Sequence, residues 1–330
     1  MPQASYAYAM GRVSVMTIKM LDAVKLRRIA EAATEREALV MLLETGYGGN
    51  LSGSNTFNKE IDYIIRDQLT QSRADVWEIT PDPERTKLFL LEVDTHNIKA
   101  FLKARLLGIE VPDILRYGGV FNLDMLKECV KTKNYEQLPD IYKKAMNEIE
   151  QDLLREVDPL SFSAKIDSAM FRYIKAELDR LHDHSFVRDY FSLMADFQNA
   201  RSLIRARFLH WDVDKIRPQL LECGEIDHRY FLEAIDTPME QLSGKLNRGS
   251  NGRLIAETLD DYNSKSQLPV FKQKMETALM EIVKKASYNP FGLGPIIGYL
   301  LGRNAEAKAL RVIFNAKRSG VEVNLPELYQ

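Results

Sequence analysis

The segment Asp94–Gly108, DTHNIKAFLKARLLG, decides the fold because the chain repeats it at Asp196–His210 as DFQNARSLIRARFLH. Seven positions carry identical or chemically similar residues in one register: Asp94/Asp196, Asn97/Asn199, Lys99/Arg201, Lys103/Arg205, Ala104/Ala206, Arg105/Arg207 and Leu107/Leu209. Self-similarity of this kind is the mark of a repeated structural unit. The chain therefore contains a duplicated helical segment.

A weaker third copy, RNAEAKALRVIFNAKRSG, runs from Arg303 to Gly320. The alignment gives three of its residues counterparts in the first two copies: Glu306 in the place of Asn97 and Asn199, Lys308 in the place of Lys99 and Arg201, and Leu310 in the place of Phe101 and Leu203. Beyond Leu310 the match is lost. This copy therefore supports the repeat less strongly than the other two.

A second marker lies upstream of each copy: FNKEID at Phe57, FSAKID at Phe162 and FKQKME at Phe271. Successive phenylalanines are 105 and 109 positions apart. A period of this length exceeds that of ordinary solenoid units and is large enough for a small domain with its own core. We therefore expect three similar helical units, at residues 1–115, 116–218 and 219–330.

The apolar spacing is helical throughout. Ile61, Ile64, Ile65 and Leu69 follow the i, i+3, i+4, i+8 pattern of an amphipathic helix. Thr34, followed by Glu37, has the spacing of a capping box, so a helix should start there. Gly108 stands where a helix commonly ends. No stretch alternates convincingly as a strand, and the predicted fold class is all-α.

Three segments are predicted to interrupt or begin helices. Thr80–Lys87, TPDPERTK, contains two prolines and should be a turn or loop. Gly244–Arg253, GKLNRGSNGR, is predicted to be rich in turns. Gly224–Asp227 is taken as the equivalent of Gly118–Phe121, each opening a new unit.

Composition limits the functional classes. The chain has 330 residues, a formal net charge of -2 and two cysteines, Cys129 and Cys223, far apart in sequence. This charge does not favour a nucleic-acid surface, and the cysteines suit a reducing compartment. The most apolar run, Phe291–Leu301, is too short to cross a bilayer, and the N-terminus lacks the features of a secretory signal. A soluble, cytoplasmic protein is expected.

The search for reactive groups predicts no catalytic, cofactor or metal site. Gly292–Gly298 only resembles a phosphate loop, since no strand precedes it. His182 and His184 have no further histidine or cysteine pair to complete a metal site. Neither cysteine has a convincing histidine partner, and no serine-nucleophile motif is present.

The repeated polar residues favour a structural interpretation. Asp94/Asp196 and Asn97/Asn199 recur with the repeat, whereas a catalytic site is usually single. Buried asparagines need partners, and a neighbouring Lys, Arg or backbone carbonyl would supply them. The alternative, a helical hydrolase using clustered carboxylates, predicts metal-dependent turnover by the isolated chain.

Two terminal segments and the repeat carry a family resemblance. YAYAMGRVSVM from Tyr6 and Tyr288–Val321, in particular PxxxYLxxRxxExKxLRxIxxxK at Pro295–Lys317, resemble the C subunit of archaeal and bacterial V-type (A-type) ATPases. That family is similar to the d subunit of eukaryotic vacuolar ATPases. The resemblance covers the whole chain. It implies an all-helical, funnel-like subunit of three similar domains in a pseudo-three-fold arrangement.

The resemblance also implies a role. Subunits of this family sit in single copy on the membrane rotor ring, at the cytoplasmic face, and receive the central stalk made of the D and F subunits. The implied function is non-catalytic coupling of that stalk to the ring, for ATP-driven H⁺ or Na⁺ transport or for ATP synthesis. The ion ligands would lie in the ring. A stiff body of packed helices suits a part that transmits torque.

One competing function and several candidate contact segments remain open. A free-standing helical adaptor for other proteins would show the same helices and the same lack of reactive groups. Partner contacts are not assigned to individual residues. The candidates are the loop tips at Gly46–Gly53 and Gly244–Gly252, the glycine segment before Tyr299, and the basic pairs Lys143-Lys144, Lys284-Lys285 and Lys317-Arg318.

Overall fold

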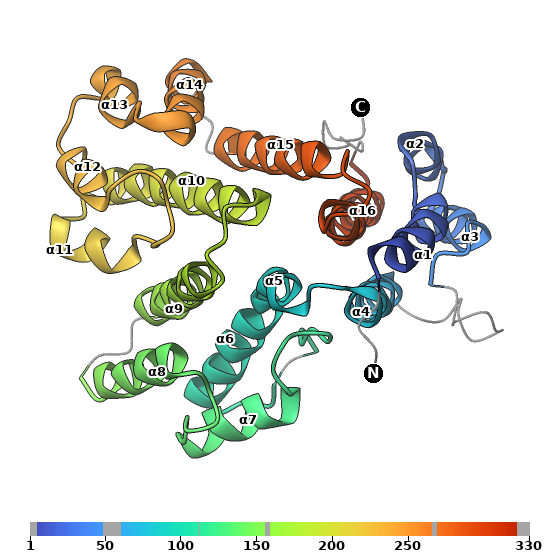
Figure 1. Ribbon diagram of the computed structural model, residues 1–330, viewed down its shortest axis with the longest axis horizontal. Helices are drawn as coiled ribbons and strands as arrows, with labels where there is room; N and C mark the ends of the chain where they lie inside the picture. The colour runs from blue at the N-terminus through green and yellow to red at the C-terminus, as the bar shows by residue number, and fades with distance from the viewer. Residues whose placement is uncertain (1–4, 49–60, 112, 156–158, 266–268, 322–330) are drawn as a thin grey trace. The chain divides into compact units, whose positions relative to one another are not determined.

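A computed structural model describes residues 5–48, 61–111, 113–155, 159–265 and 269–321. All regular structure within these ranges is helical, which confirms the predicted all-α class (Figure 1). By compactness the chain falls into two units. The terminal unit contains both ends of the chain, and the middle unit contains most of residues 87–282.

Within the described residues, the terminal unit contains five helices from the first part of the chain and the last helix. Their bounds are α1 Tyr6–Ile18, α2 Ala23–Glu31, α3 Glu35–Glu44, α4 Ile61–Ile79, α5 Pro83–Thr86 and α16 Gly294–Ser319. Residues 116–118 and the end of α15, from Val283, also belong to this unit.

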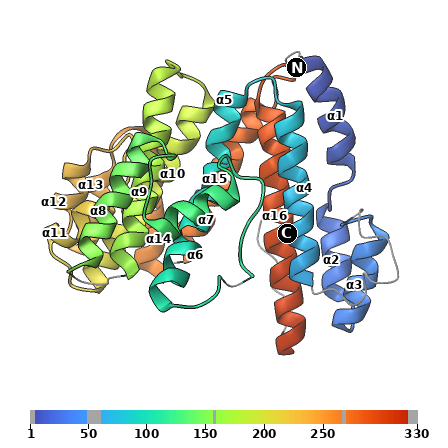
Figure 2. The ribbon, with the colours of Figure 1, turned by 90° about the horizontal axis from the view of Figure 1, so that it is seen from below.

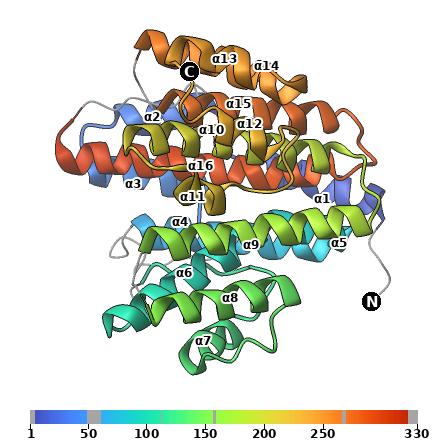
Figure 3. The same ribbon diagram turned by 90° about the vertical axis from the view of Figure 1, so that its left-hand side faces the viewer.

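The middle unit contains the remaining elements, with α15 only as far as Ile282. Their bounds are the 3-10 helix η3 Lys87–Phe89, α6 Leu91–Leu107, α7 Leu123–Thr132, α8 Asp140–Leu153, α9 Pro159–Arg180, α10 Phe186–Phe208, α11 Val213–Ile216, the 3-10 helix η4 Arg217–Gln219, α12 His228–Glu233, α13 Met239–Leu246, α14 Gly249–Lys265 and α15 Pro269–Ala286. Helices α8 and α9 lie side by side (Figure 3), and α6 contacts both α7 and α9.

The core of the terminal unit joins the two ends of the chain. Helix α16 lies beside α4 (Figures 1 and 2) and also contacts α2 and α3. Their apolar faces form one cluster of buried side chains, among them Leu26, Ile29, Ala38, Leu42, Ile64, Ile65, Leu310, Ile313 and Phe314. Burying each Leu, Ile or Phe side chain of this cluster stabilises by about 1.5–3 kcal/mol. The first and last parts of the chain therefore share a single apolar core.

Local signals predicted several helix ends correctly. Thr34 is the N-cap of α3 and accepts a hydrogen bond from the Glu37 N–H at 3.1 Å. The Glu37 carboxylate in turn accepts from the Ala33 N–H at 3.0 Å. Gly108 ends α6 with a φ of 62°, in the left-handed region that a glycine adopts without strain.

Two predicted irregular segments are partly helical, and those predictions were wrong. Residues Pro83–Thr86 of TPDPERTK form the short helix α5, since a proline is tolerated in the first turn of a helix. Within GKLNRGSNGR, α13 ends at Leu246 and α14 begins at Gly249, so only two residues separate them. The helix predicted to start at Phe57 is described from Ile61 onward, because residues 49–60 lie outside the described ranges.

The two compact units do not follow the boundaries predicted from the repeat. The division at residues 1–115, 116–218 and 219–330 concerns similarity between segments, whereas the compact units reflect packing. The three-unit division therefore stays a prediction.

Candidate functional site: acid and base contacts of the long helices

The three copies of the repeated segment lie on the three helices α6, α10 and α16. Each contains an acidic residue that is almost fully buried, Asp94, Asp196 and Glu306 respectively. A basic residue follows each of them by eleven positions: Arg105, Arg207 and Lys317. Eleven residues make slightly more than three full helical turns. Acid and base therefore lie on the same face of each helix.

Asp94 holds the segment before α7. Its carboxylate accepts hydrogen bonds from the Val120 N–H at 2.7 Å and the Phe121 N–H at 3.2 Å. The next residue, Asn122, is the N-cap of α7. At Gly119 a side chain would overlap the Asp94 carboxylate, so the close approach requires a glycine.

Asp196 makes the same contact one repeat later. It accepts from the Glu225 N–H at 2.8 Å and the Ile226 N–H at 3.2 Å, and Asp227 is the N-cap of α12. A side chain at Gly224 would overlap the Asp196 carboxylate. The two contacts therefore have the same geometry.

Glu306 provides the third acid contact with a longer side chain. It accepts from the Leu21 N–H, directly before Asp22, the N-cap of α2. Its other carboxylate oxygen lies 2.8 Å from the Arg303 guanidinium, and both side chains are buried. We call these three interactions, of Asp94, Asp196 and Glu306, the acid contacts.

The basic residues hold the other ends of the same three short helices. The Arg105 guanidinium donates to the Val130 carbonyl at 2.5 Å, within the last turn of α7. Arg207 donates to Ala234 and Ile235 at 2.9 and 2.7 Å, just after α12. Lys317 donates to Ala30 at 2.9 Å and to Ala32, at the end of α2. These are the base contacts.

Physical chemistry accounts for both kinds of contact. The last carbonyls of a helix have no partner inside it and carry a partial negative charge, so a cation stabilises them. A buried backbone N–H likewise needs an acceptor. Each long helix therefore fixes one short helix at both of its ends.

The contacts correct two alignments made from sequence. Glu306 corresponds to Asp94 and Asp196. The sequence alignment had placed it three positions away, opposite Asn97 and Asn199. In this register Arg311 matches Lys99 and Arg201, and Gly320, with a φ of 66°, matches Gly108 and His210. The signal in the sequence was the pattern of an acid, a base eleven positions later and a left-handed residue three further on.

The second correction concerns the start of the third repeat. Gly224 corresponds to Gly119, since each glycine lies against the acid contact of its repeat. The sequence had paired it with Gly118, whose space is limited instead by the Arg73 side chain. The predicted register was therefore wrong by one residue.

Burial raises the pKa of the two aspartates. The pKa of Asp94 rises to about 7 because the carboxylate is desolvated, although its backbone hydrogen bonds oppose this rise. Desolvation likewise raises the pKa of Asp196 to about 6, and the Asn251 amide, which donates to it at 2.8 Å, is the largest opposing contribution. Burial also raises the pKa of Glu306, and the positive charge of Arg303 opposes that rise.

Asn199 has the backbone partner that its burial requires. Its amide donates to the Leu221 carbonyl at 2.9 Å and accepts from the Leu221 N–H at 2.7 Å. Asn97 is buried at the equivalent position of α6. The structure therefore uses Asn199 to fix the backbone between α10 and α12.

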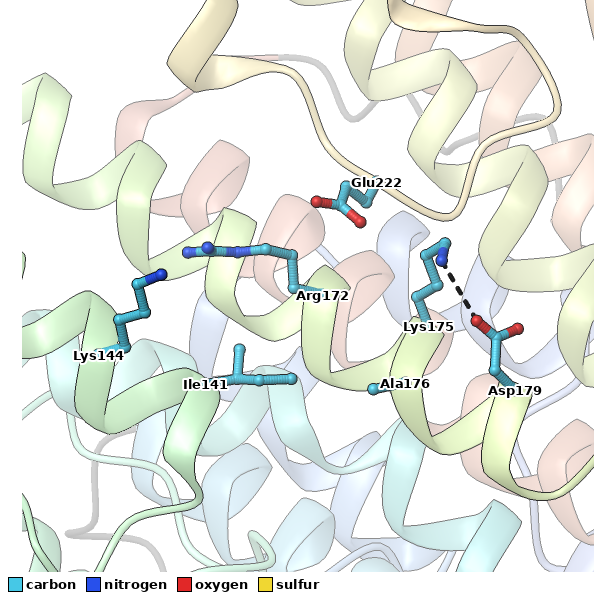
Figure 4. A pocket seen from close by; sticks show the side chains of 7 residues that line it. All are labelled: Ile141, Lys144, Arg172, Lys175, Ala176, Asp179 and Glu222. Atoms are coloured by element: carbon cyan, nitrogen blue, oxygen red, sulfur yellow. Dashed lines mark hydrogen bonds and ion pairs between the residues drawn. The ribbon is translucent and has the colours of Figure 1, made fainter.

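A cavity of about 370 Å³ in the middle unit gathers positive charge. It is lined by Ile141, Lys144, Arg172, Lys175, Ala176, Asp179 and Glu222. Figure 4 shows Lys144 and Arg172 extending toward the same space, while Lys175 pairs with Asp179 at 3.2 Å. The buried Arg172 Nε has no hydrogen-bond partner among the described atoms. The lining offers charge but no hydroxyl, thiol or imidazole for nucleophilic chemistry.

The other residues singled out from sequence are not brought together. His182 and His184 lie between α9 and α10, and His182 has a left-handed φ of 46°. Cys129 is buried in α7, and both cysteines are free thiols. Among the described residues, no group of three or more His, Cys, Asp or Glu side chains could hold a metal ion. In the same part of the chain no helix is long and apolar enough to span a bilayer.

The candidate contact segments have mixed outcomes. Gly46 and Gly48 have positive φ values, but the rest of Gly46–Gly53 lies largely outside the described residues. The supposed loop tip at Gly244–Gly252 is mostly helical, so that description of it was wrong. Lys317 is engaged with carbonyls, and Arg318 pairs with Glu35 at 2.7 Å.

Comparison with known proteins finds relatives along nearly the whole chain. The chain is 22% identical to the C subunit of the A-type ATP synthase from Methanocaldococcus jannaschii, over 95% of this chain and 83% of that protein. It is 24% identical to the corresponding protein of Methanothermobacter thermautotrophicus, over 98% and 86%. For the one from Desulfurococcus the identity is 23%, over 96% and 88%. The family model for the ATP synthase (C/AC39) subunit matches residues 9–327, and the chain belongs to this family.

Proposed function

We propose that this chain is the non-catalytic coupling subunit of a V-type (A-type) rotary ATPase. It would link the central stalk, formed by the D and F subunits, to the membrane rotor ring at the cytoplasmic face. It would then transmit torque between ATP turnover and the transport of H⁺ or Na⁺. Membership of the ATP synthase (C/AC39) subunit family supports the assignment to such a machine.

The paired acid and base contacts are the observation that carries the mechanical part of this proposal. A part that transmits torque must resist deformation between its segments. In this chain each long helix holds a short helix at both ends, by Asp94 and Arg105, by Asp196 and Arg207, and by Glu306 and Lys317. Such contacts limit sliding and tilting of one helix against another, because either motion would break buried hydrogen bonds.

In the middle unit, exposed apolar side chains offer a surface to a partner protein. Leu107 at the end of α6 is 70% exposed, and Phe208 at the end of α10 is 80% exposed. Leu209, the counterpart of Leu107 in the repeat, is also exposed. Apolar groups at the centre of an interface contribute most of its binding energy. These helix ends are therefore our candidates for contact with a partner protein.

Reconstitution from purified parts tests the function. The full chain is mixed with a D–F heterodimer and with a detergent-solubilised rotor ring, and complexes are measured by size exclusion and by binding affinity. We expect the chain to bind both and to join them in one assembly. A chain that binds neither, yet captures unrelated proteins, would be the free-standing adaptor.

Substitution of the exposed apolar residues sharpens the same experiment. Leu107→Ser together with Phe208→Ser should weaken binding to one of the two partners by at least tenfold, about 1.4 kcal/mol, with an unchanged thermal midpoint. Leu154→Ser is the control, since Leu154 is 84% exposed at the end of α8. If the double variant bound both partners with unchanged affinity, these helix ends would be excluded as the contact surface.

A further inference from the structure

The cavity at α8 and α9 receives its cationic side chains from one face of each helix. Arg172, Lys175 and Asp179 of α9 follow one another at spacings of three and four residues, so they lie on one side of that helix. Lys144 comes from α8, which packs against α9. Two neighbouring helices of the middle unit therefore bring three cations to one cavity.

These cations are only partly neutralised. Lys175 pairs with Asp179 at 3.2 Å, but Asp179 also pairs with Arg188 at 2.8 Å. Among the described residues, neither Lys144 nor Arg172 forms an ion pair with a carboxylate. The Arg172 Nε is buried and has no hydrogen-bond partner in the same part of the chain. A guanidinium in this state is unfavourable, and an anion beside it would be stabilising.

The cavity is large and open enough for a small anion. Its volume of about 370 Å³ is within the range of pockets that hold small molecules, about 300–1,000 Å³. Ala176 and Glu222 on its wall are exposed, so an ion can enter from solvent. Figure 4 shows Lys144 and Arg172 extending toward the same space. An arginine can offer two parallel N–H groups to an oxyanion, and a lysine adds a compact positive charge.

A carboxylate that also lines the cavity limits which anion can bind. Glu222 comes from the segment between η4 and α12, and Figure 4 shows its carboxylate turned toward the space beside Arg172. An ionised carboxylate only accepts hydrogen bonds. It therefore repels an anion without a proton, such as sulfate, but can accept a hydrogen bond from an anion that carries an O–H group.

Phosphate compounds differ in this respect. Inorganic phosphate keeps at least one O–H group near neutral pH. A phosphate group esterified at one oxygen loses its last proton with a pKa of about 6, so it has no O–H left to donate. The cavity therefore suits the free ion better than sulfate or the terminal phosphate of a nucleotide.

We propose that this cavity binds one hydrogen phosphate ion, with Lys144 and Arg172 holding its charged oxygens and Glu222 accepting from its O–H group. The bound ion would join α8, α9 and the segment before α12. Because all these residues belong to the middle unit, binding does not depend on the coupling role proposed above. It can be measured on the full chain without partners.

Equilibrium dialysis of radiolabelled inorganic phosphate tests the site, in a buffer free of sulfate. We expect one ion per chain, with a dissociation constant of about 1 mM or lower. Arg172→Met should weaken binding by about tenfold, because it removes hydrogen bonds from a charged donor. Lys144→Met should weaken it by roughly threefold. Lys144 is exposed, so this second variant tests the site even if Arg172→Met unfolds.

Lys143→Met is the matched control. It removes the same charge from the same helix, but Lys143 pairs with Glu136 and Asp140 and does not line the cavity. Phosphate affinity should change by less than about twofold, since a surface charge outside the site is screened. Absence of saturable binding, or equal effects of Lys143→Met and Lys144→Met, would overturn the site.

Competition by sulfate tests the part played by Glu222. In the natural chain, sulfate should displace the labelled ion roughly tenfold less effectively than unlabelled phosphate does. Glu222→Gln introduces an amide that can donate to sulfate, so this variant should bind both ions about equally. An unchanged preference in Glu222→Gln would overturn the assigned role of Glu222. Stronger competition by sulfate or ATP than by phosphate in the natural chain would overturn the assignment to hydrogen phosphate.

Discussion

The Asp94 and Glu306 contacts perform the same task in different surroundings. Asp94 is a buried carboxylate that receives two backbone N–H groups, and its partners lie 26 and 27 residues away. Glu306 receives one N–H from Leu21, 285 residues away, and has a buried arginine beside it. A contact between distant segments must overcome more loop-closure entropy. The difference between these separations corresponds to about 2 kcal/mol.

The terminal unit has several interactions that offset this cost. Lys317 and Arg318 of α16 bind the end of α2 and the start of α3, through the Ala30 carbonyl and the Glu35 carboxylate. The apolar core shared by α2, α3, α4 and α16 adds the larger part. These interactions together hold α2 and α3 against α16.

Removing the acid from the terminal unit should have the largest effect. Glu306→Ala leaves the buried Arg303 without its carboxylate and the Leu21 N–H without its acceptor. Removing one partner of a buried ion pair costs about 3–5 kcal/mol. The expected result is early unfolding of the terminal unit, measured by hydrogen exchange of α2 and α16 together.

A double substitution separates the charge from the backbone contact. Arg303→Met with Glu306→Gln removes the unpaired cation and keeps an oxygen that can accept from Leu21. This variant should recover most of the loss, to within about 1–2 kcal/mol of the natural chain. If it were as unstable as Glu306→Ala, the ion pair would not be the reason that the two contacts differ.

The pH dependence of the middle unit should report on the Asp94 contact. The pKa of Asp94 is 3.8 in the unfolded chain and about 7 when folded. The folded state therefore binds more protons between these values, and its stability falls as the pH rises. Between pH 5 and pH 8 the loss from Asp94 amounts to about 3 kcal/mol. Thermal unfolding of the middle unit, followed by hydrogen exchange, should show it.

Asp94→Asn is the matching variant, since asparagine does not titrate. It should be less stable than the natural chain at pH 5, where it satisfies only one of the two N–H groups. At pH 8 the difference should shrink, because the natural chain then carries a buried charge. An equal difference at the two pH values would show that Asp94 does not titrate in this range.

Substitution of the glycines beside the acid contacts should cause a smaller loss of stability, confined to the middle unit. Gly119→Ala or Gly224→Ala would place a methyl group against the Asp94 or Asp196 carboxylate. Forced overpacking of this kind costs about 1–3 kcal/mol. In the terminal unit the equivalent position is Lys19, two residues before Leu21, and Lys19→Ala should change stability by less than about 0.5 kcal/mol. Thermal unfolding of the three variants compares them directly.

Helices and their ends were predictable because their signals are local. Thr34 and Glu37 define the start of α3, and Gly108 defines the end of α6. Each signal lies within one turn of the helix end that it defines. The repeat was predictable from its identical residues. These features needed no knowledge of which segments meet in space.

The contacts themselves could not be predicted in the same way. Arg207 and Lys317 bind backbone carbonyls, and Arg105 binds the Val130 carbonyl as well as the Glu150 carboxylate, so no partner side chain marks the carbonyl contacts in the sequence. The register of the third copy was missed because it has a glutamate for the aspartate and Ala309 for the asparagine. Whether Gly118 or Gly119 corresponds to Gly224 is decided only by which of the two lies against Asp94.

The smallest expected effect lies at the C-terminal ends of the three long helices. Gly108, His210 and Gly320 all have left-handed backbones, with φ values of 62°, 53° and 66°. A residue with a Cβ costs roughly 1–2 kcal/mol in this region relative to glycine. His210→Gly should therefore raise the stability of the middle unit by about 1 kcal/mol, measured by thermal unfolding. Gly108→Ala should lower it by a similar amount, since nothing lies near that position and only the backbone opposes the change. If His210→Gly proved destabilising, the stabilisation by the His210 imidazole would exceed the cost of its left-handed backbone. The end of α10 would then be held by a side-chain interaction, unlike the ends of α6 and α16, where the residue is glycine.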